Sequence, residues 1–360
     1  MRELYVGVMS GTSLDGVDLA LCEINASDCE LLASAEFAFP QELKAEILNL
    51  IDGSATLKMI GELDHKLGVL FANSVNDFLT REKISASEVN AIGLHGQTLW
   101  HQPQGEFPFS TQLGDANVVV ARTGVTTVAD FRRMDMANGG QGAPFAPAFH
   151  QFLFGSLEGK VAVVNIGGMA NVTLLGSELK GWDTGCGNVL LDAWISQTRQ
   201  KAYDEDGEFA KSGELNEGLL NAMMNDDYFK KLPPKSTGRE YFNQTWLANF
   251  LPIFNSLKDE DVQRTLLELT ARSVANDVND ANATKLVVCG GGSKNRFLTQ
   301  RLRELCECEL ALSDELGVNG DALEAMAFAW LARKRIRNEV VDLSSVTGSK
   351  KNSLLGGIYG

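Results

Sequence analysis

The ten residues from Met9 to Asp18, MSGTSLDGVD, constrain the fold of this chain more than any other stretch. They lie between two apolar runs, at 4–8 and 17–24, and the second run partly alternates. This pattern predicts a strand, a turn and a second strand. Glycine and hydroxyl residues in the turn leave backbone N–H groups and side-chain donors accessible to an anion. The stretch therefore predicts an anion-binding turn built on a β-hairpin.

A nucleotide is the anion that this turn fits best, because a carboxylate beside a phosphate favours a magnesium ion between the two. Asp15 is the candidate magnesium ligand. Two other phosphate motifs are absent: a P-loop needs GxxxxGK[ST] before a helix, and a dinucleotide fingerprint needs GxGxxG at a helix start. Taken alone, the turn is also compatible with an ordinary polar β-turn. The candidate nucleotide contacts are Ser10, Gly11, Thr12, Ser13, Leu14, Asp15, Gly16, Val17 and Asp18.

A second hairpin is predicted at 161–175, VAVVNIGGMANVTLL, which is again an apolar strand, a polar turn and a strand. Its candidate phosphate contacts are Asn165, Gly167 and Gly168. The two donor-rich hairpins lie near the starts of successive halves of the chain. They predict two similar α/β lobes that close on one nucleotide.

A third glycine cluster follows the apolar run at 286–289 and precedes a helical segment at 296–306. Such a loop offers a flat backbone surface to a purine or ribose, with a helix N-terminus nearby. Its candidate contacts are Gly290, Gly291 and Gly292.

Length and charge limit the classes of protein to consider. A chain of 360 residues is expected to form two domains of about 100–200 residues each. The net charge of −15 argues against nucleic acid or an anionic membrane surface as a partner. No apolar stretch reaches the roughly 18 residues of a membrane span. No signal peptide precedes the first strand, and the six cysteines form no CxxC pair, so we expect a cytoplasmic chain with no structural metal site.

Alternating strands and helices in both halves predict α/β layers. Helices are expected at 40–51, 58–81, 113–121, 188–197, 215–225, 261–279, 296–306 and 322–335, and short strands at 91–94 and 125–129. The segment 130–150, rich in Gly, Pro and Asn, is expected to be an irregular crossing between lobes and part of the cleft wall. The first lobe is placed at 1–130 with about 336–360, and the second at 131–335.

Two acidic residues are candidates for chemistry, each with a structural alternative. Asp183, in WDTGCGN, is either a helix N-cap or a general base facing the cleft. Thr184 and the flanking glycines favour the general base, because they supply more hydrogen-bond donors than a helix cap requires. Glu324 lies at the capping-box position of a helix that Asp321 would cap, or it faces the substrate.

Two basic residues are candidates for substrate binding. Arg132, in Asp130-Phe131-Arg132-Arg133, belongs to a solvated surface or binds a carboxylate-bearing substrate in bidentate fashion. His95 and Gln97 lie at a strand end, where ligands tend to bind in α/β sheets. His95 is equally a candidate for a hydrogen-bonded structural residue.

Several short blocks of the sequence resemble those of one protein family. GVMSGTSLDGVD, LHGQT, the GDANVVVARTG and VADFRRMDMANGGQGAP blocks, VVNIGGMANVT, WDTGCGN, STGREYF and VVCGGGSKN are similar to those of anhydro-N-acetylmuramic acid kinases, in order over nearly the whole chain. The resemblance implies a two-lobed, actin-like ATPase fold with duplicated ribonuclease H-like domains and a cleft between them. This agrees with the paired hairpins.

The resemblance also implies a reaction. Water opens the 1,6-anhydro ring of the cell-wall amino sugar at its anomeric carbon, while the freed 6-oxygen takes the γ-phosphoryl group of ATP. The products are N-acetylmuramic acid 6-phosphate and ADP. The family's catalytic aspartate lies in its DTGxGN motif, which corresponds to Asp183 as general base toward the water. ATP and Mg2+ are the implied cofactors, and a homodimer engaged in peptidoglycan recycling is the implied context.

Two alternatives stay open. One is another sugar kinase of the same fold, in which Asp183 deprotonates a sugar hydroxyl directly. The other is a nucleotide-gated assembly protein without enzymatic activity.

Overall fold

The computed structural model describes residues 2–12, 14–53, 55–254 and 256–360. The chain divides into two compact units: unit 1 comprises 1–153 and 322–360, and unit 2 comprises 154–321. Within the described ranges, none of the helices combines the length and apolarity that a membrane span requires.

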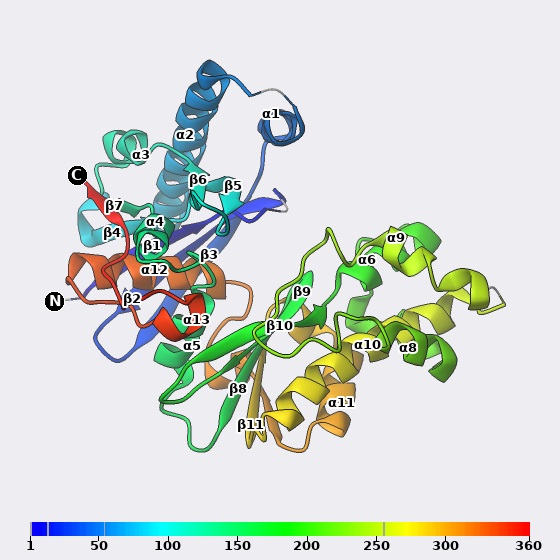
Figure 1. Cartoon of the computed structure of the whole chain (residues 1–360). Helices are drawn as coiled ribbons and strands as arrows, with labels where there is room; N and C mark the ends of the chain where they lie inside the picture. Colours follow the sequence, from blue (N-terminus) through cyan, green and yellow to red (C-terminus); the bar gives the residue numbers. More distant parts are fainter. Residues whose placement is uncertain (1, 13, 54, 255) are drawn as a thin grey trace. The chain divides into compact units, whose positions relative to one another are not determined.

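Unit 1 is built on a sheet with the order β13-β7-β4-β1-β2-β3 (Figure 1). β1 pairs antiparallel with β2 and parallel with β4, and β7 continues the parallel direction. β5 and β6 form a separate antiparallel pair. The strands are β1 (Leu4–Met9), β2 (Gly16–Ile24), β3 (Cys29–Ala38), β4 (Val89–Leu94), β5 (Gln97–Gln102), β6 (Phe109–Leu113), β7 (Thr127–Ala129) and β13 (Gly357–Tyr359).

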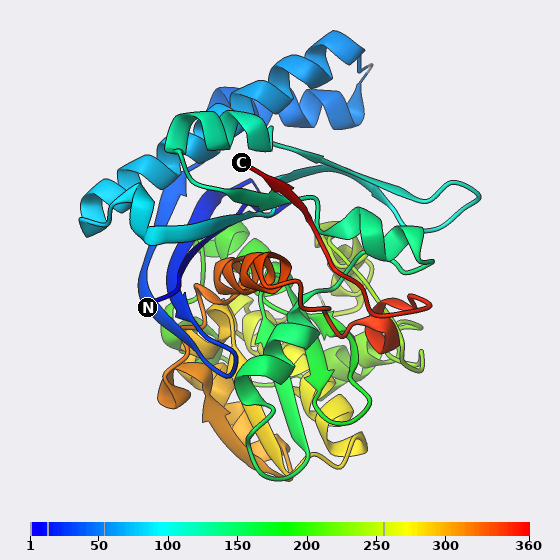
Figure 2. The ribbon, with the colours of Figure 1, turned by 90° about the vertical axis from the view of Figure 1, so that its left-hand side faces the viewer.

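Helices cover both faces of this sheet. Buried residues of β1, β2 and β4 form one hydrophobic core with α2, including Phe71, Val75 and Phe78. On the opposite face α12 crosses the strands, as Figure 2 shows. The helices are α1 (Gln41–Asp52), α2 (Leu57–Glu82), α3 (Ala116–Thr123), α4 (Arg132–Ala137), α5 (Ala146–Phe154), α12 (Leu323–Ile336) and α13 (Ser344–Thr347), with a 3₁₀ turn at Ala86–Glu88.

Unit 2 repeats the topology. Its sheet has the order β10-β9-β8-β11-β12, in which β8 pairs antiparallel with β9 and parallel with β11. The position of β8 in this order therefore matches that of β1 in unit 1. The strands are β8 (Val161–Ile166), β9 (Met169–Leu174), β10 (Lys180–Cys186), β11 (Lys285–Cys289) and β12 (Glu309–Leu312).

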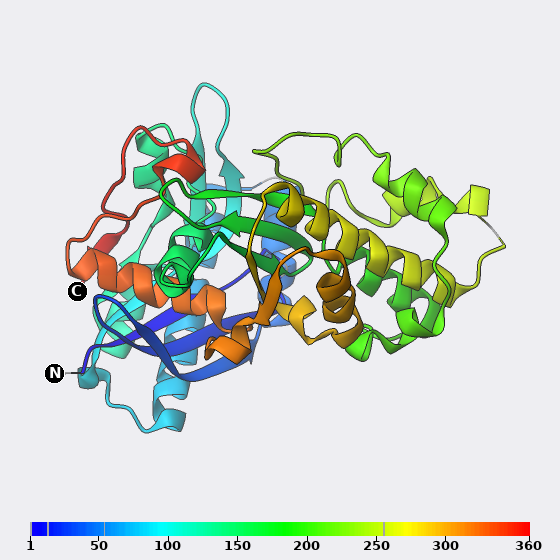
Figure 3. The same cartoon turned by 90° about the horizontal axis from the view of Figure 1, so that it is seen from below.

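The helices of unit 2 are α6 (Val189–Arg199), α7 (Glu208–Ser212), α8 (Glu217–Met224), α9 (Gln244–Ala248), α10 (Asp259–Asp280) and α11 (Arg296–Leu305). α10 lies along the sheet and shares one hydrophobic core with it (Figure 3). α6, α7, α8 and α11 pack against α10, and α9 packs against α6. Short 3₁₀ turns lie at Glu205–Gly207, Leu251–Phe254, Gly291–Lys294 and Ser313–Leu316.

The boundaries of the units differ from those predicted at 130/131 and 335/336. α12 was assigned to the second lobe, but it packs on β1, β2 and β4 of unit 1. Two strand glycines allow this close packing. An added Cβ would lie 1.7 Å from the carbonyl oxygen of Ala325 at Gly7, and 1.9 Å from that of Phe328 at Gly93. The periodicity at 322–335 predicts a helix, but a local pattern does not indicate which sheet that helix packs on.

Two other predictions for unit 1 were inaccurate. The segment 130–150 is not irregular throughout, because it contains α4 and the start of α5. The helix expected at 113–121 begins at Ala116, after β6 has ended at Leu113. Asp115 caps that helix by accepting a hydrogen bond from the N–H of Asn117 at 2.8 Å.

Candidate functional site

The first predicted turn connects β1 to β2, with Met9 opposite Asp18 in the antiparallel register. Ser10 is buried, and its Oγ donates a 2.6 Å hydrogen bond to Oε1 of Gln97. The Gln97 amide also donates to the carbonyl of Gly11 at 3.3 Å. Gln97 therefore fixes the start of the turn. Ser13, another predicted contact, lies outside the described residues.

The side chains of this turn do not all face solvent. Leu14 and Val17 are buried in the hydrophobic core, so only their backbone atoms are available to a nucleotide. Leu14 adopts a φ of 57°, a conformation that turns the chain sharply before β2. Thr12 and Asp15 are exposed. Thr12 and Asp15, unlike Leu14 and Val17, therefore present side chains that a ligand can reach.

A lysine reaches this turn from another element. Lys44 of α1 places its Nζ 3.2 Å from the carbonyl oxygen of Leu14 and 3.6 Å from Oδ1 of Asp15. The turn is not a P-loop, because no lysine follows its glycines. Lys44 was not predicted, since no local spacing links a residue of α1 to the β1–β2 turn.

His95 connects the turn to the arginine predicted for substrate binding. Its Nδ1 lies 3.1 Å from the carbonyl oxygen of Ser10, so this nitrogen carries the proton. Its Nε2 then accepts from Nη2 of Arg132 at 2.7 Å and from the Gln112 amide at 3.2 Å. Burial, followed by the positive charge of Arg132, lowers the pKa of His95 to about 3. His95 is therefore a neutral, fully bonded imidazole.

Arg132 begins α4 and is held on several sides. Its Nη1 donates to the carbonyl of Gly142 at 2.9 Å, and its guanidinium lies 5.1 Å from the ring centroid of Phe145. Its buried Nε has no hydrogen-bond partner in the part of the chain that the structure describes. Burial lowers the pKa of Arg132 to about 10, and the negative charge of Glu324 opposes this effect. The alternative prediction, that Arg132 belongs to a solvated surface, is therefore wrong.

Glu324 lies in the first turn of α12, one helical turn before Phe328, whose ring centroid is 4.7 Å from that of His95. The capping alternative for this segment is also wrong. The N-cap residue of α12 is Ala322, without a side-chain cap, and Asp321 instead forms an ion pair with Lys294. The four predicted substrate contacts, His95, Gln97, Arg132 and Glu324, thus share one region of unit 1.

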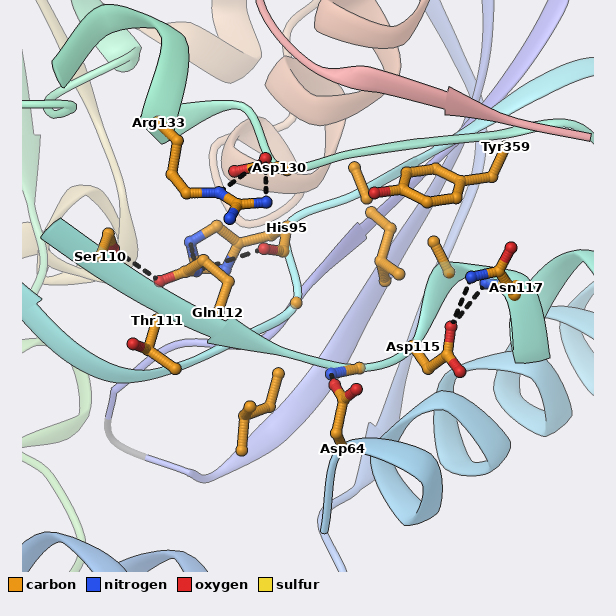
Figure 4. Close-up of a pocket in the computed structure, with 16 residues that line it drawn as sticks. Asp64, His95, Ser110, Thr111, Gln112, Asp115, Asn117, Asp130, Arg133 and Tyr359 are labelled. Atoms are coloured by element: carbon orange, nitrogen blue, oxygen red, sulfur yellow. Dashed lines mark hydrogen bonds and ion pairs between the residues drawn. The ribbon is translucent and has the colours of Figure 1, made fainter. Parts of the chain in front are cut away.

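A polar pocket of about 280 Å³ adjoins this region, at the carboxyl ends of β4 and β7 (Figure 4). His95 lines it, whereas most of its other residues were not predicted. Asp64 of α2 accepts from the N–H of Gly114 at 2.7 Å, and Asp130 pairs with Arg133 at 2.5 Å. Its lining residues are Asp64, Leu94, His95, Gly96, Ser110, Thr111, Gln112, Leu113, Gly114, Asp115, Ala116, Asn117, Ala129, Asp130, Arg133 and Tyr359.

The second predicted turn, in unit 2, connects β8 to β9. The carbonyls of Gly167 and Gly168 accept from the N–H groups of Asn188 at 2.8 Å and Gly187 at 2.9 Å. The end of the WDTGCGN block therefore packs directly on this turn.

The third glycine cluster lies against the same turn. An added Cβ would come within 2.2 Å of Oδ1 of Asn165 at Gly290, and within 2.4 Å of the Ile166 side chain at Gly292. At Gly291 it would meet nothing within 4 Å. Packing thus accounts for the outer two glycines and leaves the middle one exposed.

A cation also reaches the second turn. Two guanidinium nitrogens of Arg239 lie 3.7 and 3.8 Å from the Cβ position of Gly168. Burial raises the pKa of Asp192 to about 6, and the positive charge of Arg239 opposes that rise. Arg239 belongs to the STGREYF block, which the sequence analysis used for the resemblance without giving the arginine a role.

Asp183 lies on β10, opposite Asn171 of β9, and is half-buried. It is a strand residue, so the helix-cap alternative is wrong. Its Oδ2 accepts hydrogen bonds from Oγ of Ser236 and from the N–H of Thr237, both at 2.9 Å. Burial raises the pKa of Asp183, these two hydrogen bonds lower it, and Glu240 raises it. A carboxylate of this kind can accept a proton from water.

The strand order and turns of the two units define the structural class of this protein. Each unit carries the ribonuclease H-like strand order, with a glycine-containing turn between its first two strands, and this duplicated arrangement is that of the actin-like ATPases and sugar kinases. The match to known proteins is more specific. Residues 3–360 match the model of the family described as anhydro-N-acetylmuramic acid kinase. The chain belongs to this family of carbohydrate kinases.

Relatives of the same name are similar over their full length. The anhydro-N-acetylmuramic acid kinase of Sulfurimonas denitrificans is 53% identical, with 100% of both chains covered. That of Sulfurovum sp. is 54% identical over 99% of each chain. Among solved structures, a ROK family glucokinase from Streptomyces griseus, in complex with glucose and AMPPNP, is 13% identical, with 92% of this chain and 99% of that chain covered and a TM-score of 0.45.

Proposed function

We propose that this chain uses ATP and water to convert 1,6-anhydro-N-acetylmuramic acid into N-acetylmuramic acid 6-phosphate and ADP, a step in the recycling of cell-wall sugars. The family match over residues 3–360 carries this proposal. The transferred phosphoryl group needs an oxygen nucleophile, and the substrate's 6-oxygen becomes one only when its bridge to the anomeric carbon breaks.

Asp183 is the proposed general base. It takes a proton from water as that water attacks the anomeric carbon, and the bridging C1–O6 bond breaks with its electrons on O6. The O6 atom then attacks the γ-phosphorus of ATP, and ADP leaves. The half-buried position of Asp183 and its raised pKa support this role, because a base works best when its pKa approaches the working pH.

The three glycine-containing loops are the proposed nucleotide contacts. The turn at 10–18 and the turn at 165–168 supply N–H and hydroxyl donors to the phosphates, and the loop at 290–292 faces the adenosine. Leu14 and Val17 take part only through their backbone, since their side chains belong to the core. The open space beside Gly291 supports contact with a ligand, because packing places no demand on that residue.

Asp15 is the proposed Mg2+ ligand. Its exposed carboxylate offers the oxygen donors that this cation prefers, so the residue fits the ion, although Lys44 competes for the same oxygen. Bound Mg2+ would neutralise phosphate charge during transfer. Lys44 and Arg239 are proposed as further cationic contacts to the phosphates, because each lies beside a turn.

His95, Gln97, Arg132 and Glu324 are the proposed sugar-binding region. Arg132 is the candidate partner of the lactyl carboxylate, since its buried Nε retains an unused donor. We propose that His95 and Gln97 act mainly by holding Arg132 and Ser10, because their side chains already bind these residues. We also propose that the chain forms a homodimer and acts in the cytoplasm, where ATP is available.

The test is incubation with ATP and the anhydro sugar in water enriched in oxygen-18. We expect a phosphorylated product with one heavy oxygen at the anomeric position, measured by mass spectrometry. Phosphorylation of glucose or of N-acetylmuramic acid, with no reaction of the anhydro sugar, would favour the ordinary sugar kinase. Filaments that sediment with ATP, without any sugar product, would favour the assembly protein.

A further inference from the structure

One oxygen of the Asp183 carboxylate accepts hydrogen bonds from the protein. Ser236 and Thr237 both donate to Oδ2, while Oδ1 accepts no hydrogen bond from any of the residues placed by the structure. A carboxylate held in this way has one oxygen fixed and the other available to a water molecule. Ser236, the first of the two donors, lies 53 residues beyond Asp183 in the sequence.

The backbone of Asp183 is held by the same part of the chain. Its N–H donates to the carbonyl of Lys235 at 3.0 Å, and its carbonyl accepts from the hydroxyl of Tyr228 at 2.8 Å. The pairing of β10 with β9 shifts register between Asp183 and Gly185, which marks a β-bulge. Bulges redirect side chains beside functional sites. The residues from 228 to 237 therefore hold both the backbone and the side chain of Asp183 at this bulge.

Asp277 of α10 connects the strand to that loop. Its Oδ2 accepts from Nε1 of Trp182 at 2.7 Å and lies 3.6 Å from Nζ of Lys235. The Lys235 and Asp277 side chains are only 5% and 15% exposed. The Lys235 ammonium also lies 5.4 Å from the ring centroid of Tyr228. A buried ion pair is costly unless both partners are well bonded, so this arrangement fixes the loop and the strand relative to one another.

We infer that Asp277 is a positioning residue of the reaction: through Trp182 and Lys235 it holds the Ser236–Thr237 donors against one oxygen of Asp183. This inference rests on the proposed role of Asp183 as general base. None of the positioning residues needs to touch the sugar.

The charged and titratable groups around Asp183 determine how the inference is tested. Burial raises the pKa of Asp183, the two hydrogen bonds to Oδ2 lower it, and the negative charge of Glu240 raises it. Lys235 and Asp277 face the same segment with opposite charges, and Tyr228 is a titratable neighbour. The base is active when deprotonated, so activity falls as the pH drops through its pKa.

The first test is Ser236→Ala. This residue is exposed, so the variant is expected to fold with an unchanged thermal midpoint. Loss of one charge-assisted hydrogen bond should lower kcat at neutral pH about tenfold and move the acid limb of the kcat profile up by about one pH unit. The KM for ATP should not change. An unmoved acid limb would overturn the contribution of Ser236.

The second test is Asp277→Asn, because two explanations predict opposite signs. Loss of a nearby negative charge would by itself lower the pKa of Asp183 and move the acid limb down. Loss of the positioning contacts loosens the two donors and moves it up. We expect an upward shift with a lower kcat. A downward shift, or none, would contradict the inference.

Two further variants complete the design. Trp182→Phe removes only the indole donor, without a change of charge, and should reproduce a part of the upward shift even if Asp277→Asn fails to fold. Asp259→Asn is the matched control: its carboxylate pairs with Arg199 at 3.1 Å at the other end of α10, and its pH profile should match that of the wild type. If the wild type forms no phosphorylated sugar, the proposed function fails. If it does and the acid limb stays fixed in all variants, only this inference fails.

Discussion

Gly7 of β1 lies in direct contact with the backbone of Ala325 in α12, so closely that a Cβ on the glycine would be 1.7 Å from the alanine's carbonyl oxygen. Neither partner can yield easily, since one belongs to a central strand and the other to a buried helix. This contact fixes how near α12 approaches the sheet that carries the β1–β2 turn.

Gly7→Ala is therefore expected to destabilise unit 1 by about 3 kcal/mol, because overpacking displaces a whole helix rather than one side chain. Chemical denaturation measures the change. Gly61→Ala in α2 is the control: nothing lies within 4 Å of its Cβ position, and the exposed helical site should gain up to about 1 kcal/mol. Equal stability of Gly7→Ala and the wild type would show that α12 shifts freely.

Asp183→Asn should lower turnover of the anhydro sugar by about 10³-fold or more, since an amide cannot take the proton from water. ATP binding should survive, because the predicted nucleotide contacts lie in other loops. Coupled detection of ADP and calorimetric titration with ATP measure the two quantities separately. Retained turnover would remove Asp183 from its proposed role.

Gly291→Val should raise the KM for ATP about tenfold without a change in thermal midpoint. None of the described residues lies within 4 Å of its Cβ position, so a new side chain would occupy the space proposed for the nucleotide. Gly292→Ala provides the contrast, because its Cβ would press on Ile166 at 2.4 Å and should reduce stability. A similar loss of stability in both variants would contradict the different roles of these two glycines.

Glu268 should make unit 2 sensitive to acid. Burial alone would raise its pKa, but hydrogen bonds from Arg301, Arg264 and Arg272 bring the pKa down to about 2. A carboxyl with a lowered pKa stabilises the fold above its ordinary pKa near 4.5 and loses that contribution as the pH falls toward 2. We expect a loss of about 3 kcal/mol over this interval.

Glu268→Gln should abolish most of that pH dependence and destabilise the protein at neutral pH by about 3–5 kcal/mol, because three guanidiniums lose their anion. Glu304→Gln is a suitable control, since its exposed carboxylate pairs with Arg301 and accepts a 2.8 Å hydrogen bond from the Gln300 amide. Denaturation at a series of pH values checks both expectations.

Removal of divalent cations with EDTA should stop the reaction, and added Mg2+ should restore it. Asp15→Asn should then need about tenfold more Mg2+ for half-maximal rate, because a neutral amide binds the cation more weakly. The same Mg2+ dependence in variant and wild type would move the metal ligand elsewhere.

The sequence predicted best those features that are encoded locally. Both hairpins follow from alternating apolar residues around polar, glycine-containing turns, and α2 and α10 follow from helical periodicity; the structure confirms all four. β13 was not predicted, because three residues that complete a sheet edge have no periodicity of their own. The same holds for β5 and β6, whose pairing was not anticipated.

Contacts between residues that lie far apart in the sequence could not be predicted from local patterns either. Lys44 and Asp277 lie on helices whose apolar periodicity does not depend on these residues, and Arg239 lies in a turn far along the chain from β8 and β9. The bulge at Asp183 was not predicted for a related reason: the glycines of WDTGCGN favoured a helix start, whereas pairing with β9 makes Trp182 to Cys186 part of a strand.

The return of the chain to unit 1 after residue 321 has a consequence for biosynthesis. Unit 2 is continuous, so it can fold on the ribosome as soon as it emerges. The sheet of unit 1, although translated first, must wait for α12 with one apolar face uncovered. Until then that face is a natural target for chaperones, and slow translation of the last forty residues would prolong its exposure to aggregation.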